Sequence, residues 1–316
     1  MHTPPSFDLA ICGAGPVGMA LAALLVQRGS AAAGIALLDA KSIEQAGRDP
    51  RTIALSHGSR QILEEAGAWP VDATAIHQIH VSRRGHFGRS LMDRAEHGVE
   101  ALGYVARYGA VVAALADVCA RLGVASVRPA LVTGSTEEAD GVTIQVEQLG
   151  TASSLRAQLL VQAEGGLFGQ QAERAVSRDY GQSAIIAHVR ASNPVAHRAY
   201  ERFTDEGPLA LLPQDDGYAL VWCVPPTRAE QLLALASVDL KTAYGRDFAS
   251  CVERVDITVR GHAMAAPLPG FRSNAGLKAL REHDGAILFA HADLSGFSVF
   301  EEAAWWGDRA ARLAAA

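Results

Sequence analysis

Apolar residues near the N terminus form two short runs on either side of a longer, mostly apolar stretch. The short runs are residues 7–12 and 35–39, and residues 16–27 stay apolar over a length that suits a helix. Short continuous apolar runs are typical of strands that are buried on both faces, as in parallel sheets. The chain therefore begins with a predicted strand–helix–strand unit.

Further along the chain, helical and strand-like periods alternate. Helical spacing of apolar residues predicts helices at residues 50–68, 111–122, 231–240 and 301–315. Alternation and short apolar runs predict a hairpin at residues 76–91 and strands at 124–132, 142–148, 159–166, 184–189, 209–212, 218–224 and 286–290. The β-rich middle lies between pieces of an α/β fold, which predicts two interleaved domains rather than two consecutive ones.

The turn between the first strand and the first helix is rich in glycine. Its residues have the spacing G-x-G-x-x-G and are Gly13, Ala14, Gly15, Pro16, Val17 and Gly18. Gly13 allows a tight turn, Gly15 lets the backbone approach a pyrophosphate, and Gly18 lets the helix lie close to the strand. The N terminus of the helix offers free N–H groups and a positive dipole to the phosphates.

Asp39 ends the second predicted strand, 21 positions after Gly18. A carboxylate at this place can accept hydrogen bonds from both hydroxyls of an adenosine ribose. A glycine motif also arises as a chance turn, but here a strand, a helix and a terminal acid accompany it in order. The N-terminal unit therefore predicts a dinucleotide site.

Composition and charge narrow the functional classes. The 316 residues are 49% apolar and 20% charged, as in a globular protein, and the net charge of −6 argues against a nucleic-acid partner. The four cysteines form no C-x-x-C pair, which suggests a reducing compartment, and the histidines show no metal-binding spacing. Neither a signal sequence nor a membrane-spanning run is recognised. We therefore expect a cytoplasmic protein of one or two domains without a metal site.

Several stretches after the glycine turn identify a family. They are residues 49–56 (Asp-Pro-Arg-Thr-Ile-Ala-Leu-Ser), 79–90 (Ile-His-Val-Ser-Arg-Arg-Gly-His-Phe-Gly-Arg-Ser), 101–105 (Ala-Leu-Gly-Tyr-Val), 179–187 and 201–213. With them the chain closely resembles the FAD-dependent hydroxylases of ubiquinone biosynthesis, in the para-hydroxybenzoate hydroxylase class of flavin monooxygenases. The resemblance covers roughly residues 6–225, and it is specific because ungapped blocks recur in the same order.

The resemblance implies an α/β fold in which two domains are interleaved. One is a Rossmann-like FAD-binding domain of the glutathione-reductase type, comprising residues 1–75, 100–178 and 275–316. The other is a β-rich substrate domain, comprising residues 76–99 and 179–274. The substrate pocket is expected between the nucleotide fold and the β-rich segment of residues 180–225, and it should be largely apolar.

The same resemblance implies an FAD-dependent aromatic monooxygenase. FAD would be reduced by NADH or NADPH, and one atom of O₂ would enter the ring of a lipophilic, prenylated ubiquinone precursor. The cofactor carries this chemistry, so no catalytic side-chain set is expected and none is assigned. Such a substrate leaves open a peripheral contact with the inner face of the membrane, or with a biosynthetic complex. The oligomeric state is open as well.

By resemblance, four further residues are candidates for FAD contacts. Arg51 should lie near the pyrophosphate or ribose, where a bidentate cation suits phosphate, although it could also be a surface arginine at a helix start. Arg107 lies where the family often places a flavin contact, but its local sequence departs from the usual pattern. Asp293 and Gly296 are candidates for the turn that binds the ribityl chain. The alternative for Asp293 is an N-cap-like turn residue.

Two motifs of the family are altered in this chain. Where the family has an Asp-Gly turn followed by Ser and Arg, the sequence reads Glu164-Gly165 and lacks both downstream residues. In residues 288–304 a Pro and most of a Gly-rich turn are missing, and the usual C-terminal helical extension is not found after Ala316. We therefore expect a divergent and short member. It is either a working hydroxylase or a non-catalytic or weakly active relative that serves as an accessory or scaffold subunit.

Overall fold

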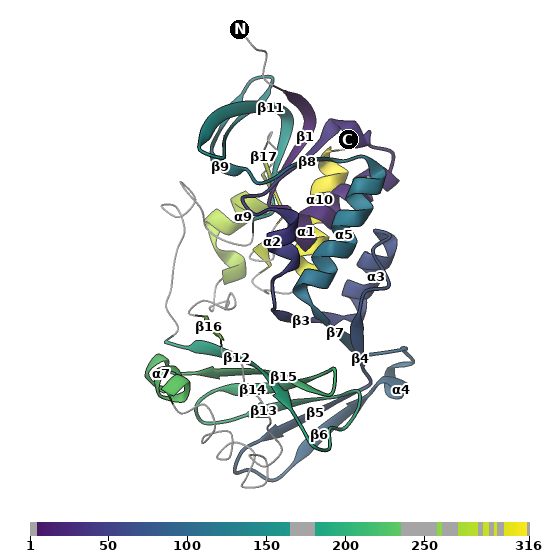
Figure 1. The fold of residues 1–316 in the computed structure, drawn as a ribbon, viewed down its shortest axis with the longest axis vertical. Coiled ribbons are helices and arrows are strands. Elements are labelled where there is room, and N and C mark those ends of the chain that lie inside the picture. Colours follow the sequence, from purple (N-terminus) through teal and green to yellow (C-terminus); the bar gives the residue numbers. More distant parts are fainter. Residues whose placement is uncertain are drawn as a thin grey trace.

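The predicted strand–helix–strand unit is present in the computed structural model of the chain (Figure 1). Strand β1 (Ser6–Cys12) is followed by helix α1 (Pro16–Gln27) and strand β2 (Ile35–Leu38), and the two strands pair in parallel. Every residue of β2 is buried because both faces of the sheet are covered. The structure describes residues 5–164, 181–234, 258–260, 271–283, 287–290, 294–295 and 300–314.

The first sheet has a parallel centre. Its parallel strands lie in the order β8-β2-β1-β11-β17, with β8 at Ala125–Val127, β11 at Thr151–Gln162 and β17 at Ile287–Phe289. Strands β9 (Leu131–Glu138) and β10 (Gly141–Gln148) extend it in antiparallel fashion along the first half of β11. This order is the Rossmann-like arrangement, which gathers the carboxyl ends of the parallel strands at one edge.

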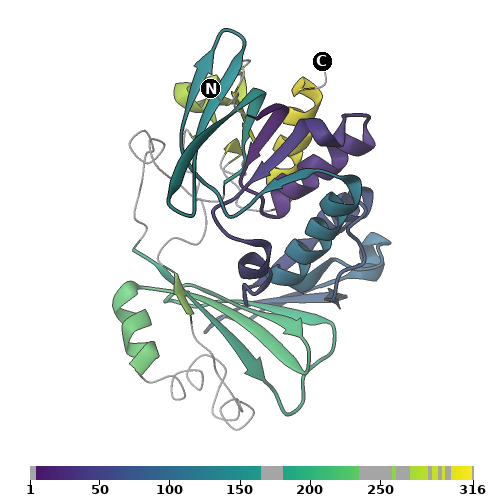
Figure 2. The same ribbon diagram turned by 45° about the horizontal axis from the view of Figure 1, so that its top comes forward.

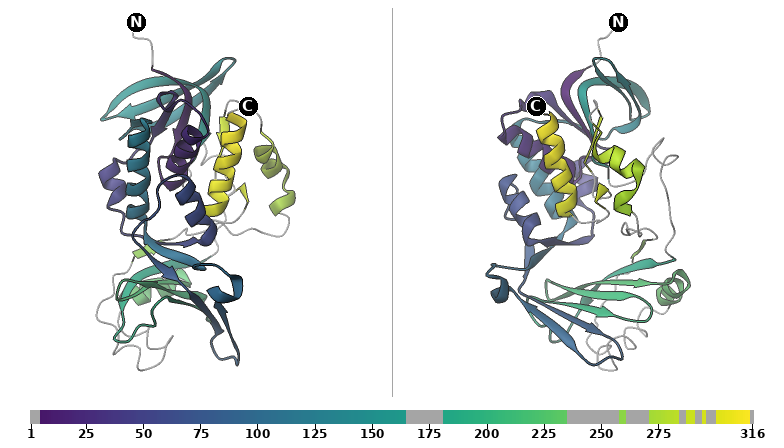
Figure 3. Two further views of the ribbon diagram at one scale, coloured as in Figure 1. Left: turned by 90° about the vertical axis from the view of Figure 1, so that its right-hand side faces the viewer. Right: turned by 180° about the vertical axis from the view of Figure 1, so that it is seen from behind.

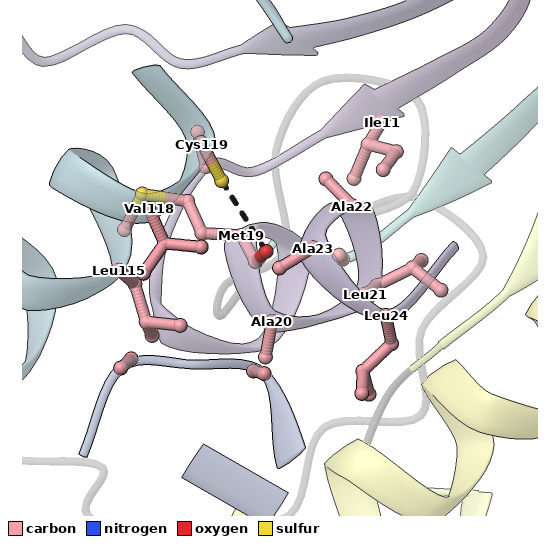
Figure 4. Packing of buried hydrophobic residues seen from close by; sticks show 14 of the residues in the cluster. Ile11, Met19, Ala20, Leu21, Ala22, Ala23, Leu24, Leu115, Val118 and Cys119 are labelled. Carbon is pink, nitrogen blue, oxygen red and sulfur yellow. Dashed lines mark hydrogen bonds between the residues drawn. The ribbon is translucent and has the colours of Figure 1, made fainter. Parts of the chain in front are cut away.

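Helices α1, α5 (Tyr108–Leu122) and α10 (Phe300–Ala314) cover one face of this sheet (Figure 3). In Figure 4, Met19 of α1 lies against Leu115 of α5, and the Cys119 thiol donates a 3.4 Å hydrogen bond to the Met19 carbonyl. The antiparallel strands β9 and β10 curl over the other face. Helix α1 is therefore held firmly against β1, with its N terminus at the glycine turn.

The second sheet lies at the other end of the molecule (Figure 2) and has the order β16-β12-β15-β14-β13-β5-β6. Its strands are β5 (Gln78–Arg83), β6 (Arg89–Asp93), β12 (Ser183–Arg190), β13 (Arg198–Phe203), β14 (Pro208–Gln214), β15 (Gly217–Val224) and β16 (Thr258–Arg260). Strand β5 precedes β8 and β11 of the first sheet in the chain, and β13 follows them. Because β5 pairs in parallel with β13, segments from before and after these strands share one sheet. The expected interleaving of an α/β domain with a β-rich domain is confirmed.

A small antiparallel sheet joins the two larger ones. It consists of β3 (Thr52–Ser56), β7 (Gly103–Arg107) and β4 (Ala73–Ile76). The Thr52 hydroxyl donates a 2.8 Å hydrogen bond to the Gln214 side-chain oxygen of β14, which is buried. This buried contact ties the β-rich sheet to the nucleotide-binding half.

The predicted helix at residues 50–68 is wrong in its first half. That part is strand β3, and helix α3 is confined to His57–Glu65. The β-branched Thr52 and Ile53 favour a strand, and β7 provides the antiparallel partner. The Ser56 hydroxyl then caps α3 by accepting a hydrogen bond from a backbone N–H of its first turn.

Most other predicted elements occur with shifted ends. The strand at 124–132 is divided into β8 and β9 around Pro129, which has no N–H to donate to a sheet. The predicted helix at 231–240 begins earlier, and its second part lies outside the described residues.

The short helices are α2 (Ile43–Gly47), α4 (Arg94–His97), α7 (Pro226–Ala234) and α9 (Ala275–Arg281), with 3-10 turns at Ala32–Gly34 and Phe271–Ser273. No helix in the described part of the chain has the length and apolar character needed to span a bilayer.

Candidate functional site

The glycine turn connects the end of β1 to the start of α1. Gly13 has a φ of +97°, which glycine adopts without strain, and its N–H donates a 2.9 Å hydrogen bond to the Leu38 carbonyl. A β-carbon at Gly13 would lie 2.6 Å from the backbone of Ala163, and one at Gly18 would lie 2.0 Å from the Gly13 carbonyl oxygen. Only glycine therefore fits at either position without movement of the backbone.

Helix α1 begins at this turn with an uncapped N terminus. Gly15 is the N-cap, Pro16 lies in the first turn, and among the described residues no side chain caps the helix. The first turn also contains no acidic residue. Its free N–H groups and the positive end of its dipole therefore favour an anion such as a pyrophosphate.

Asp39 follows β2 directly and holds the glycine turn. Its Oδ2 accepts a 3.0 Å hydrogen bond from the Ala14 N–H, and its Oδ1 accepts a 2.8 Å hydrogen bond from the Lys41 N–H. A carboxylate has about four acceptor positions, so about two remain for the hydroxyls of a ribose. The Asp39 side chain keeps 20% of its surface exposed, which leaves these positions within reach of a ligand.

Arg128 lies beside Asp39 and was missed in the sequence analysis. Its side chain is only 3% exposed, and it donates hydrogen bonds to the carbonyls of Ala14, at 3.2 Å, and Lys41, at 2.9 Å. Its Nη2 lies 3.8 Å from the Asp39 carboxylate and has no hydrogen-bond partner among the described residues. One buried guanidinium thus ties together the loops after β1, β2 and β8. The sequence does contain an indication of this role. Arg128 follows an apolar run, and the end of such a parallel strand lies at the carboxyl edge of the sheet, where the nucleotide binds.

Arg51 reaches the glycine turn through Tyr108, a second residue that the sequence analysis missed. The Arg51 guanidinium lies 4.3 Å from the centre of the Tyr108 ring and forms a 2.6 Å ion pair with Asp49. The Tyr108 hydroxyl lies 3.2 Å from the place that a β-carbon on Gly15 would occupy. Burial raises the pKa of this hydroxyl, so it stays protonated and can donate. Arg51 precedes strand β3, so the alternative of a helix-start arginine is wrong.

Arg107 links the nucleotide-binding half to the β-rich sheet. It ends β7, and its Nη2 forms a 2.7 Å ion pair with Asp215 in the β14–β15 turn. The His188 Nε2 lies 3.8 Å from the same carboxylate. Both partners of the arginine pair are about half exposed, so solvent screens the interaction and it contributes little to stability.

Glu164, the residue that replaces the family's aspartate, lies just after β11 beside the glycine turn. Burial, and then the charge of Asp39, raise the pKa of the Glu164 carboxyl. Burial, and then Glu164, raise the pKa of the Cys12 thiol, which keeps it protonated and unreactive. Gly165, Asp293 and Gly296 lie outside the described residues, so the roles expected for Asp293 and Gly296 stay predictions.

We expect Glu164→Gln to raise thermal stability at neutral pH. An acid whose pKa is raised on folding contributes stability below its unfolded pKa and loses that contribution as the pH rises through the folded value. Ionised Glu164 therefore costs stability at neutral pH, and the amide should raise Tm by about 2–4 °C, the shift for roughly 1 kcal/mol in a chain of this size. Thermal unfolding at neutral pH and at about pH 4 measures the effect, since most of the carboxyl is protonated at the lower value. Equal gains in Tm at both pH values would show that the charge of Glu164 is not the cause.

The chain belongs to the family described as FAD binding domain. The sequence pattern of this family matches residues 6–231, which include the glycine turn, Asp39 and most of the β-rich sheet. FAD is therefore its cofactor. The residues present fit this group, because the uncapped helix suits a pyrophosphate and the remaining acceptor positions of Asp39 suit a ribose.

A named relative confirms the resemblance to the hydroxylases of ubiquinone biosynthesis at the level of the family, and a second relative carries no functional name. The 3-demethoxyubiquinol 3-hydroxylase of Escherichia coli is 29% identical over 254 residues, which are 77% of this chain and 64% of that protein. An uncharacterized protein of Synechocystis sp. is 30% identical over 250 residues, which are 76% of this chain and 59% of that protein. The chain thus spans about six-tenths of the length of these relatives.

The fold is shared with flavin enzymes of known structure. The p-nitrophenol 4-monooxygenase of Pseudomonas putida superposes with a TM-score of 0.72, over 98% of this chain and 79% of that chain, at 14% sequence identity. At this identity the similarity shows the fold alone. It confirms the α/β architecture with a Rossmann-like domain and an interleaved β-rich domain.

Proposed function

We propose that the chain is an FAD-dependent monooxygenase that hydroxylates an aromatic, prenylated ubiquinone precursor. NADH or NADPH would supply two electrons, one atom of O₂ would enter the ring and the other would leave as water. The observation that carries the proposal is the joined site of glycine turn, Asp39 and Arg128, in a chain that also folds a β-rich sheet and is similar to a demethoxyubiquinol hydroxylase.

Within this function, the chain's own residues would bind and orient the cofactor. Residues 13–18 and the N terminus of α1 would hold the pyrophosphate, and Asp39 would accept hydrogen bonds from the adenosine ribose. Arg51 would place its charge beside the pyrophosphate, and Arg107 would contact the flavin half from the end of β7. Asp293 and Gly296 would bind the ribityl chain. When bound, FAD supplies the activation of O₂.

The domain limits are part of the proposal. The FAD-binding domain would comprise residues 1–75, 100–178 and 275–316, and the substrate domain residues 76–99 and 179–274. The pairing of β5 with β13 supports this division, because it joins the two stretches of the second domain. We also propose a cytoplasmic location with peripheral contact to the inner face of the membrane, which a prenylated substrate would require.

The aromatic substrate would bind on the face of the second sheet that is turned toward β4 and β7. Ala199 of this face packs with Val105 of β7. Strand register and alternation place Glu201, Ala210 and Val221 on the same face. Burial raises the pKa of the half-buried Glu201 carboxyl. A mostly apolar face with a single carboxyl suits an aromatic ring that carries a hydroxyl group and a prenyl chain.

The second candidate function is an accessory, non-catalytic or weakly active flavin-binding subunit of quinone biosynthesis. Glu164 favours it, because it stands beside the glycine turn where the family has an aspartate. The altered residues 288–304 favour it as well. Flavin absorbance of the purified protein, bleaching by NADH or NADPH under anaerobic conditions, and hydroxylated product in air test the two candidates. A colourless protein that takes up no FAD would contradict both.

We expect the flavin to be poorly coupled to hydroxylation. Glu164 and the altered residues 288–304 would leave the flavin site open to water, which diverts activated oxygen to H₂O₂. Oxidation of NADH or NADPH should therefore yield mostly peroxide, and Glu164→Asp alone should change the ratio little because the second alteration remains. Parallel assays of nicotinamide oxidation, peroxide and product measure the coupling. Tight coupling in the unmodified chain would show that both departures are harmless.

Arg128→Met is expected to weaken FAD binding about tenfold, the effect of losing about 1–2 kcal/mol of buried hydrogen bonding. The substitution keeps the apolar volume but removes the donors to Ala14 and Lys41 and the charge beside Asp39. Quenching of flavin fluorescence on titration measures the affinity. Arg48→Met is the matched control, since Arg48 is an exposed arginine at the end of α2. Equal FAD affinity in both variants would exclude a role for Arg128.

A further inference from the structure

The hairpin of β5 and β6 carries an exposed aromatic residue at its tip. Phe87 is fully exposed and lies between Gly85 and Gly88, around which there is open space. The hairpin reaches the end of the molecule opposite the N terminus (Figures 1 and 3). Phe203, at the end of the adjoining strand β13, is 48% exposed and stands opposite Arg83. Phe87 buries no area within the chain and Phe203 only about half of its own, and exposed aromatic rings gathered at one place are typical of a contact surface.

Basic residues surround this aromatic tip. Arg83 and Arg89 are exposed, Arg84 is half-buried, and residues 82–92 contain no acid. Across the described part of the chain, none of these three arginines forms an ion pair. The adjoining β13–β14 turn contributes one exposed acid, Asp205. The tip is thus locally cationic on a chain whose net charge is −6.

We propose that this hairpin tip, defined as residues 83–89 together with Phe203, docks the protein on an anionic lipid surface. Cationic side chains around a projecting aromatic ring match the interface of a bilayer, where the ring enters the headgroup layer and the arginines contact anionic headgroups. The tip projects from the molecule and forms no groove, so it suits the fluid and uniform surface of a bilayer. The proposal gives the peripheral membrane contact of the proposed function a defined surface, but it does not rest on hydroxylase activity, because docking depends on the tip alone.

Charge reversal and removal of the ring should each weaken docking. An arginine near an anionic surface contributes about fivefold to the affinity for that surface. Arg83→Glu changes the charge by two units, so it should lower the affinity for anionic vesicles by roughly 25-fold. Phe87→Ser should cost about tenfold through the lost insertion of the ring. The matched controls are Arg121→Glu, at an exposed arginine in the last turn of α5, and Leu149→Ser, at a 93% exposed leucine in the β10–β11 turn. Neither control should change binding.

The experiment is flotation of the full chain with vesicles of phosphatidylcholine alone or with about 30 mol % phosphatidylglycerol, at low and high salt. The expected result is binding only to the anionic vesicles, weakened by salt and by the two tip variants. Failure to float with anionic vesicles, or equal losses in tip and control variants, would overturn the proposal. So would light scattering that shows a dimer dissociated by Phe87→Ser, because the tip would then bind a second copy of the chain.

Flavin content of each preparation separates this inference from the proposed function. A chain that lacks FAD but floats through the tip supports docking while the hydroxylase proposal fails. A flavin-loaded, active chain that does not float overturns docking alone.

Discussion

Gly18→Ala should disrupt the nucleotide site, although alanine is the better helix former. In an open helical position the exchange stabilises by roughly 0.5–1 kcal/mol. At Gly18 the new β-carbon would lie 2.0 Å from the Gly13 carbonyl oxygen and 3.1 Å from an Ile11 methyl group. The turn or helix α1 must move to relieve this overlap, which costs about 1–3 kcal/mol or more. We expect Tm to fall by about 5 °C or more, and FAD affinity to fall by more than about tenfold because the turn is displaced.

Thermal unfolding without flavin and fluorescence titration with FAD measure the two effects. Gly47→Ala is the matched control, because Gly47 ends helix α2 and has no atoms within 4 Å of a new β-carbon. It should leave both quantities near those of the unmodified chain. If Gly18→Ala behaved like this control, the close approach of α1 to the glycine turn would be wrong.

Asp39→Ala is expected to weaken FAD binding by about 1–3 kcal/mol, which corresponds to roughly 5- to 150-fold. The proposed ribose hydroxyls would lose their acceptor, and the Ala14 and Lys41 N–H groups would lose theirs at the same time. Arg128 would also keep its buried charge without the neighbouring carboxylate. The sequence alone predicts little change in stability without flavin, whereas these contacts predict a measurable loss.

Asp39→Asn separates the two roles of this side chain. The amide keeps one oxygen acceptor and the shape of the side chain, but it removes the charge and one acceptor group. We expect its FAD affinity to lie between those of the alanine variant and the unmodified chain. Titration with FAD and thermal unfolding of the flavin-free forms provide the comparison. Unchanged FAD affinity in both variants would refute contact between Asp39 and the ribose.

The core of the candidate site could be predicted because it is encoded locally. Gly13, Gly18 and Asp39 fall within one strand–helix–strand unit, and each meets a requirement of a tight turn or of close packing. Apolar runs in that unit are continuous because the strands are buried on both faces. Local residue type and spacing therefore carry enough information to predict both the unit and its nucleotide chemistry.

Prediction failed where a neighbour distant in the sequence decides the structure. Thr52–Ser56 is a strand because β7 provides a partner about fifty residues later, and no local period shows that partner. The strand predicted at residues 124–132 includes Pro129 for the same reason. Its missing N–H matters only once the neighbouring strands are placed, and it then separates β8 from β9.

The amino-acid sequence by itself determined the class of fold, the glycine turn and the acid that follows β2. Only the tertiary structure decided that Arg128 lies beside Asp39, that the Tyr108 hydroxyl lies by the glycine turn, and that Arg107 pairs with Asp215. The physical reason is that parallel strands bring their carboxyl ends to one edge only when the sheet has formed. Side chains that lie far apart along the chain then become neighbours, and no spacing of residues along the chain records that proximity.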